Sequence, residues 1–218
     1  MKSILISIKP KWVAKILNGE KTIEIRKTCP KQLRGDTPIK PEPIDVYIYC
    51  TKEEDIARIG RLGGDEFVCK MYPLNEVQWK SMNKEYSAKG KVVAKFTLNK
   101  VEEYRPFFHW CIEKETCLTR DNVLNYLDSE DSFVGNPKRQ GKVYAWHISN
   151  LEIFDRPREL SEFKHIKPSI CGKKDNNGLY QCDKCIYGNK ESLECRRNKV
   201  KAPQSWQFVE SENDNERM

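Results

Sequence analysis

The sequence predicts an α+β fold, a small curled sheet or β-barrel with two or three flanking helices. Three observations support this class. Short segments with the alternation and β-branched content of strands recur along the 218 residues. Helical periodicity appears in only a few places, and strands do not alternate regularly with helices as in a parallel α/β protein. A chain of this length buries about 70% of the surface that its unfolded form exposes, enough for a substantial core.

The first quarter of the chain predicts a strand and then a helix. Residues 1–7 hold a short apolar run without a small-residue cleavage site, so we expect a strand and not a signal peptide. Val13, Ile16 and Leu17 follow at helical spacing, between a proline and a glycine that are typical of helix ends.

Two further strands follow this helix. Residues 22–26 alternate with period two, which places Glu24 and Arg26 on one face of a strand and Ile23 and Ile25 on the other. Four prolines make residues 28–43 a loop, and residues 44–50 have high β propensity.

The remaining elements are less regular in sequence. We expect short helices and loops over residues 52–90, because Gly63 and Gly64 interrupt that segment. Thr119 is a plausible N-cap for a helix that carries Val123 and Leu127. The other strands are expected at residues 91–98, 143–148, 151–154 and 205–209, with Ser149 and Asn150 between the second and the third of them.

Charge and hydropathy define the broad class. The net charge is +7, and residues 1–40 hold ten Lys and Arg against three Asp and Glu. Residues 164–201 hold ten basic residues against four acidic ones. Two basic regions favour a polyanionic partner, although solvated lysines are common on any surface. A mean hydropathy of −0.75, without a long apolar run, excludes a transmembrane helix, and we expect a cytoplasmic protein with no membrane partner.

Four strings of this sequence resemble the ASCH domain, a relative of the PUA fold: SIKP (7–10) with GEKTIEIR (19–26), YAWHIS (144–149), PRELSEF (157–163) and APQSW (202–206). The first carries the glycine-x-lysine-x-x-glutamate-x-arginine string of that family. The whole set is similar to the longer ASCH proteins of bacteria and their prophages. The resemblance implies a β-barrel with a basic cleft at Lys21–Arg26, and binding of RNA or modified nucleotides, with DNA as a further option.

We therefore divide the chain into an ASCH-like barrel (1–165 and 202–210, with an insertion at 52–90), a cysteine-rich lobe (166–201) and a flexible tail (211–218). The ligand-binding residues that we expect in the barrel are Lys9, Lys21, Glu24, Arg26, Gln204, Ser205 and Trp206. Lysine and arginine hold phosphates or base edges, and Glu24 accepts from an exocyclic amine. An ion pair that only steadies the barrel is the structural alternative.

Nine cysteines without a secretory signal argue against a disulfide framework. Five of them (Cys29, Cys50, Cys69, Cys111 and Cys117) are scattered, and we expect small buried side chains there. The other four, Cys171, Cys182, Cys185 and Cys195, have the spacing of a structural four-thiolate zinc site, with one zinc per chain. His165 is a less typical substitute ligand. A redox pair at Cys182 and Cys185, or an iron–sulfur cluster, is the alternative.

Two other functional classes remain open. Some small ASCH proteins look like amidohydrolases of acetylated cytidine that use a lysine and a threonine of this segment, and others are linked to RNA cleavage. Lys21 matches that lysine, but Glu24 stands at the threonine position, so Lys21 and Glu24 are catalytic only if the protein is a hydrolase or ribonuclease. A regulatory module that binds a protein through the 52–90 insertion is the third class.

Overall fold

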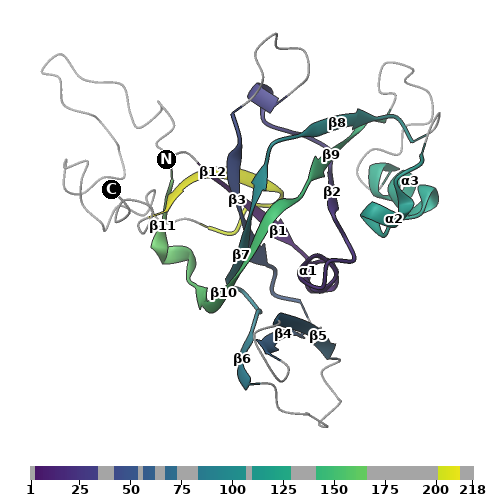
Figure 1. Ribbon diagram of the computed structural model, residues 1–218. Helices are drawn as coiled ribbons and strands as arrows, with labels where there is room; N and C mark the ends of the chain where they lie inside the picture. The colour runs from purple at the N-terminus through teal and green to yellow at the C-terminus, as the bar shows by residue number, and fades with distance from the viewer. Residues whose placement is uncertain are drawn as a thin grey trace, which may run out of the picture.

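The computed structural model describes residues 3–33, 42–53, 56–61, 67–72, 83–106, 110–128, 141–165 and 201–211. The α-helices in these ranges are α1 (Pro10–Leu17), α2 (Glu113–Thr116) and α3 (Arg120–Asp128), and the 3-10 helices are η1 (Lys31–Leu33) and η2 (Leu160–Glu162). The strands are β1 (Ser3–Ile8), β2 (Ile23–Arg26), β3 (Ile44–Cys50), β4 (Ile56–Arg61), β5 (Phe67–Tyr72), β6 (Asn83–Ser87), β7 (Val92–Leu98), β8 (Val101–Tyr104), β9 (Val143–His147), β10 (Ser149–Arg158), β11 (Phe163–His165) and β12 (Trp206–Ser211). This strand-rich content with few helices confirms the α+β class (Figure 1).

The described strands form three sheets with the orders β10-β7-β3-β1-β12-β11, β2-β9-β8 and β5-β4-β6. Strand β1 lies inside the largest sheet, parallel to β3 and antiparallel to β12. Its alternate residues enter two cores: Ile4, Ile6 and Ile8 join the main core, and Leu5 joins a second one with Phe163 and others. Burial on both faces explains why this strand reads as a continuous apolar run.

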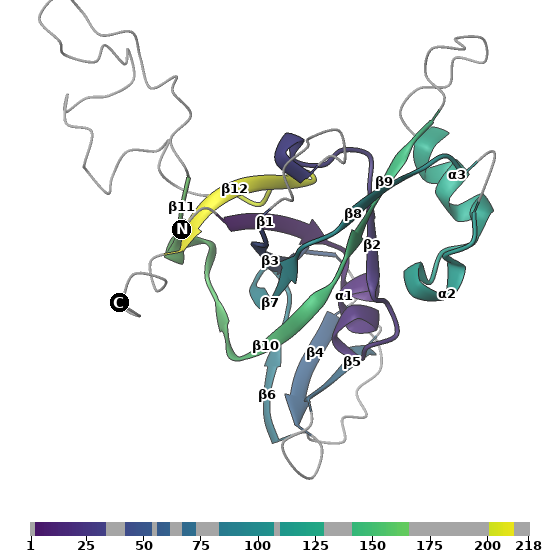
Figure 2. The ribbon, with the colours of Figure 1, turned by 45° about the horizontal axis from the view of Figure 1, so that its top comes forward.

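Two long antiparallel strands connect the largest sheet to the β2-β9-β8 sheet. Strand β7 continues into β8, and β9 continues into β10, so that Val101 faces Trp146 and Thr97 faces Ser149 along one ribbon (Figure 2). Asn150 has φ of 49°, which marks a bend in the ribbon. This bend falls at the interruption that the sequence places between the strands expected at 143–148 and 151–154, and β9 and β10 pair with different neighbours and not with each other.

Helices α2 and α3 lie beside the β2-β9-β8 sheet (Figure 1). Ile23, Ile25 and Ala145 of that sheet pack with Ile112 and Val123 in a third core. Thr119 caps α3 as predicted, since its Oγ1 accepts from the Asn122 backbone N–H at 3.2 Å and its own N–H donates to Asn122 Oδ1.

The helices and loops expected over residues 52–90 are wrong for the described part of that segment. Residues in β4, β5 and β6 form an antiparallel sheet, and α1 contacts β4 and β5. Two glycines between runs rich in β-branched and aromatic residues also favour a hairpin, and this second meaning of the pattern was missed.

No closed barrel appears among the described strands, which corrects the barrel part of the sequence prediction. Strand β2 ends its own sheet, and no described backbone ladder joins it to β1 or β12. Side chains bridge this junction: Arg26 donates to the Ser7 carbonyl at 2.7 Å, and Trp206 Nε1 donates to Thr28 Oγ1 at 3.0 Å. We call this junction of Ser7, Arg26, Thr28 and Trp206 the seam.

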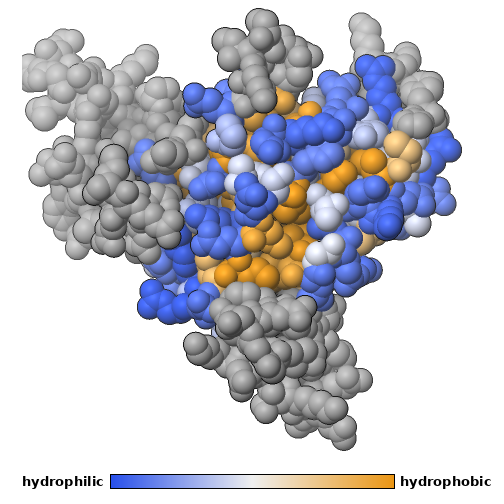
Figure 3. Space-filling model, in the orientation of Figure 1, coloured by the Kyte–Doolittle hydropathy of each residue, from blue (hydrophilic) through white to orange (hydrophobic). Residues whose placement is uncertain are grey.

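Apolar residues gather in the middle of the face drawn in Figure 3, with hydrophilic residues along its borders. Partly buried side chains around the main core, such as Ile148, Leu151 and Ile153 on the long ribbon, are consistent with such a surface. Across the described ranges, no helix is both long enough and apolar enough to span a bilayer.

Candidate functional site

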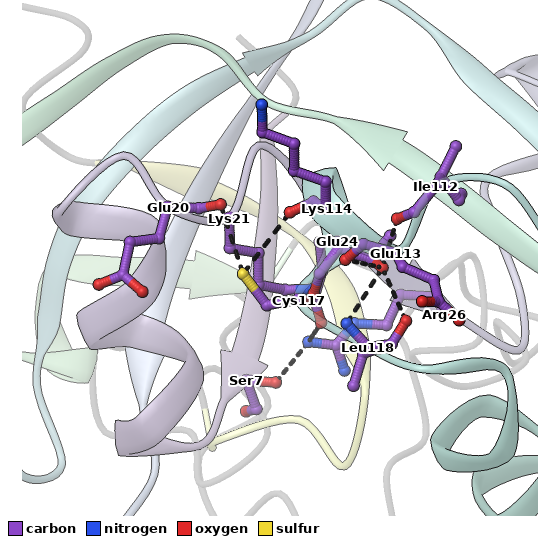
Figure 4. Close-up of polar contacts among 11 residues, drawn as sticks. Ser7, Glu20, Lys21, Glu24, Arg26, Ile112, Glu113, Lys114, Cys117 and Leu118 are labelled. Carbon is purple, nitrogen blue, oxygen red and sulfur yellow. Dashed lines mark hydrogen bonds and ion pairs between the residues drawn. The ribbon is translucent and has the colours of Figure 1, made fainter.

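Three charged side chains meet inside the molecule beside the seam. Lys21, Glu24 and Arg26 are only 2%, 7% and 7% exposed. Lys21 Nζ lies 3.4 Å from Glu24 Oε2, and Arg26 Nη2 lies 3.0 Å from Glu24 Oε1 (Figure 4). We call this group the ion cluster. The carboxylate thus stands between two cations in a setting where water does not screen the charges.

Lys21 is held by three different groups. Besides Glu24, its ammonium donates to the Thr116 carbonyl at 2.7 Å and lies 5.4 Å from the centre of the Trp12 ring. Burial is the largest influence on this group and lowers the pKa of Lys21 from its usual value of 10.5, while the nearby Glu24 carboxylate opposes that shift. Position 21 therefore carries an amine whose proton is held less firmly than that of a surface lysine.

Arg26 links the ion cluster to the seam. Its guanidinium binds the Glu24 carboxylate and the Ser7 carbonyl, so it joins β2 to β1 without a backbone ladder. Its Nε is buried and has no hydrogen-bond partner among the described residues. Trp146 of the adjacent strand β9 pairs with Glu24 in register, and its Nε1 is buried and unpartnered within the same described set.

The sequence separates a charged face from an apolar face in residues 22–26, and the structure shows the surroundings of each face. Both faces of β2 are buried. Ile23 and Ile25 pack in the third core, while Glu24 faces the tryptophan of β9 and Arg26 faces its tyrosine. Alternation separated the two faces correctly. It did not reveal that tertiary packing covers both.

The other predicted ligand residues are arranged around the seam or close to it. The Ser205 carbonyl accepts from the Ser7 N–H at 3.0 Å, and the Trp206 ring lies 5.9 Å from that of Trp146. Gln204 is exposed next to them. Lys9 follows β1, and its side chain is 67% exposed and lies 3.3 Å from Glu53. Segments almost 200 residues apart in sequence thus share one junction.

Sequence reasoning missed the parts of the site that act through the backbone. The Thr116 and Ser7 carbonyls bind the two cations, and a carbonyl gives no residue-type signal. Cys117 was expected to be buried, but it is half-buried in a left-handed conformation with φ of 55°, and its Sγ donates to the Glu20 carbonyl at 3.3 Å. Cys111 is exposed, whereas Cys29 and Cys50 are buried as expected.

The expected zinc ligands, Cys171, Cys182, Cys185 and Cys195, lie outside the described residues, as do residues 166–200 and 212–218. The substitute ligand His165 ends β11, next to them in sequence. Within the described ranges, no group of three or more His, Cys, Asp or Glu side chains is placed to hold a metal ion.

Together, the fold and this site define an α+β protein with a buried lysine–glutamate–arginine cluster at the open edge of a three-stranded sheet. The ASCH domain model matches residues 6–158, and the chain belongs to the ASCH domain family. No curated protein sequence matches this chain.

Solved structures of an ASCH protein also match this chain. The ASCH protein from Zymomonas mobilis is 15% identical, with a TM-score of 0.47 over 98% of this chain and 91% of that one. A tyrosine-to-phenylalanine variant of the Zymomonas mobilis protein is 16% identical, with a TM-score of 0.46 over 99% of this chain and 96% of that one.

Proposed function

We propose that this ASCH protein binds RNA or a modified nucleotide at the seam, with the ion cluster beneath it. The observation that carries the proposal is the meeting of Lys21 and Arg26 on a single carboxylate. Burying three charges costs several kcal/mol of desolvation per ion, and hydrophobic residues of similar volume would stabilise the fold as well or better. A ligand role supplies a reason for keeping the charges there.

The surface around the seam has the composition that a polyanion needs. Residues 25–33 contain one arginine and two lysines without any Asp or Glu, and residues 201–209 contain one lysine and again no acid. Lys31 and Lys201 are exposed. Phosphates neutralised by such side chains release counterions, which supplies affinity without sequence specificity. Trp206, half-buried at the seam, offers a ring on which a base can stack.

The test is a binding titration of a labelled single-stranded RNA, followed by fluorescence anisotropy at several salt concentrations. We expect the affinity to fall steeply with salt, and Trp206→Leu to weaken it by about 1–3 kcal/mol through loss of stacking. Trp110→Leu is the matched control, because Trp110 is a partly buried tryptophan that packs against the third core and not at the seam. Absence of salt-dependent binding to RNA, DNA or nucleotides would contradict the proposal.

A hydrolase or ribonuclease is the second candidate, and the buried amine of Lys21 is the observation that favours it. A lysine with a lowered pKa can exchange a proton nearer to neutral pH than a surface lysine, and Glu24 lies within 3.4 Å of it. Incubation with labelled RNA and with acetylated cytidine, beside Lys21→Met, separates the two candidates. Product formed by the wild-type protein alone would favour the enzyme, and binding without product would favour the binding protein.

We also propose that residues 166–201 form a zinc-bound lobe that adds a second basic surface. The support is the spacing of Cys171, Cys182, Cys185 and Cys195, together with ten basic residues in 164–201. Four thiolates leave no open coordination position, so this zinc would stabilise the lobe and take no part in chemistry. Free thiols and a metal of this kind fit a reducing compartment such as the cytoplasm.

A further inference from the structure

Two buried hydrogen-bond donors beside the ion cluster are unpartnered. They are Arg26 Nε and Trp146 Nε1, and neither has an acceptor in the part of the chain that the structure describes. A buried donor left without an acceptor costs about 1–3 kcal/mol, so native proteins rarely keep two in one place. The other unpartnered buried side-chain atoms in the described ranges are the hydroxyls of Ser7 and Thr51, which can both donate and accept.

These two donors lie on the same face of one strand pair. In the β2–β9 ladder, Glu24 faces Trp146 and Arg26 faces Tyr144, so Arg26 and Trp146 are diagonal neighbours. Their face is the one opposite Ile23, Ile25 and the third core. Diagonal neighbours in an antiparallel pair have Cα atoms about 7–8 Å apart, within reach of long and aromatic side chains.

The two unpartnered groups both require the same kind of hydrogen-bond partner. The Glu24 carboxylate already receives Lys21 on one oxygen and Arg26 on the other. An arginine Nε–H and an indole N–H can only donate. The group that completes this site must therefore supply acceptors. Since Lys21 and Arg26 bring two positive charges against the single negative charge of Glu24, a negatively charged acceptor also balances the cluster.

We propose that the ion cluster takes an anionic oxygen group, a phosphate or a carboxylate, whose oxygens accept from Arg26 Nε and Trp146 Nε1. The inference rests on the proposed function for the place of the ligand, and it adds which part of the ligand enters. For a nucleotide, the phosphate enters the cluster and the base stays at the Trp206 side. Entry is easiest at the seam, where side-chain hydrogen bonds and no described backbone ladder join the β2 segment to β1 and β12.

The test follows the indole N–H signals of the whole ¹⁵N-labelled protein during titration with sodium phosphate at constant ionic strength. The chain has five tryptophans, and single Trp→Phe variants assign their signals, Trp146 by elimination if its own variant does not fold. We expect a saturable shift of the Trp146 signal with phosphate. The Trp110 signal should not move, because its N–H already donates to the Leu118 carbonyl at 3.1 Å. Parallel titrations with sodium acetate and with neutral cytidine distinguish a carboxylate and a base from a phosphate.

Variants give a second measurement. Arg26→Lys keeps the charge but removes Nε, and Trp146→Phe keeps an aromatic ring but removes the N–H. Each should weaken phosphate binding about tenfold or more, and Trp110→Phe should leave it unchanged. No shift of the Trp146 signal with either anion, or cytidine binding as tightly as its monophosphate, would overturn the inference.

The two proposals fail in different ways. If RNA binds without a shift of the Trp146 signal, and still binds to Arg26→Lys, the proposed anion site is contradicted and the proposed function is supported. If phosphate shifts the Trp146 signal but neither RNA nor nucleotides bind, the anion site is supported and the proposed function is contradicted.

Discussion

At the residue scale, the ion cluster is a set of mutually dependent charges. Glu24 is neutralised by Lys21 and Arg26 together, and each cation has one further acceptor, the Thr116 or the Ser7 carbonyl. Removing one member of a buried ion group leaves an uncompensated charge, which is more costly than the absence of the whole group. Substitutions here therefore affect stability as well as ligand binding.

Arg26→Met should lower the free energy of unfolding by about 3–5 kcal/mol, because Glu24 loses one of its two cations in a buried setting. The double variant Arg26→Met with Glu24→Gln should recover part of that loss, since no unpaired carboxylate remains. Urea unfolding measures both. Lys15→Met is the control: its pair with Glu20 is largely solvent-exposed and contributes about 1 kcal/mol or less. Equal losses in Arg26→Met and Lys15→Met would contradict the buried ion cluster.

Lys21 should give the fold a distinctive dependence on alkaline pH. Burial lowers its pKa in the folded state below the usual 10.5, so between these two pKa values the unfolded chain binds more protons than the folded chain. Stability then rises with pH in this window, because the cost of burying the charge is relieved as Lys21 loses its proton. Below the folded-state pKa the contribution is flat.

The measurement compares wild-type protein with Lys21→Met by urea unfolding at a series of pH values up to about 10.5. The wild-type protein should gain stability relative to the variant as pH rises toward 10.5, the usual value for lysine. Titration of the other lysines and tyrosines is common to both proteins and cancels in the difference. A constant difference across the range would mean that Lys21 titrates as an ordinary lysine.

At the element scale, the sequence predicted most helices and strands that have a local signal. The proline and glycine around α1, the alternation in β2 and the threonine before α3 all appear in the structure as expected. The prediction for residues 52–90 was wrong because a pair of glycines is compatible with both a break in a helix and the turn of a hairpin. The interruption at Ser149 and Asn150 was predicted as well, but the partners of the strands on either side of it were not, since strand partners are chosen by tertiary packing and not by local sequence.

The cap of α3 gives a prediction at this scale. Thr119→Ala should lower the free energy of unfolding by about 1 kcal/mol, because the Asn122 N–H loses its acceptor on Thr119 Oγ1. Thr119→Ser keeps the hydroxyl and should cost little. Thermal or urea unfolding of the three proteins decides, and equal effects of the two substitutions would show that the methyl group and not the cap matters.

At the scale of the whole molecule, the proposal of a zinc-bound lobe depends on the free energy of ordering residues 166–201. Residues 168–202 hold few large apolar side chains, and ordering their backbone costs about 1–2 kcal/mol per residue. Zinc can supply on the order of 10 kcal/mol in small cysteine sites, which is enough to fold such a segment.

We expect one zinc per chain in protein purified without added metal, measured by elemental analysis. Cys182→Ser should lose the metal, whereas Cys111→Ser should keep it, because Cys111 is an exposed cysteine outside the predicted ligand set. A chelator should make residues 166–201 sensitive to protease before the sheets unfold. Less than about half an equivalent of zinc per chain, with residues 166–201 still resistant to protease, would contradict the proposed zinc-bound lobe.

The sequence by itself determined the family, the α+β class and the identity of Lys21, Glu24 and Arg26 as residues of interest. Each of these depends on residue types at fixed spacings, and such spacings are visible in one dimension. The tertiary structure alone decided that the three charges are buried, that two backbone carbonyls hold the cations, and that no described ladder joins β2 to β1 or β12 at the seam. The reason is physical: burial and pairing arise from the meeting of segments such as β2, β9 and β12, and no local pattern records which segments meet.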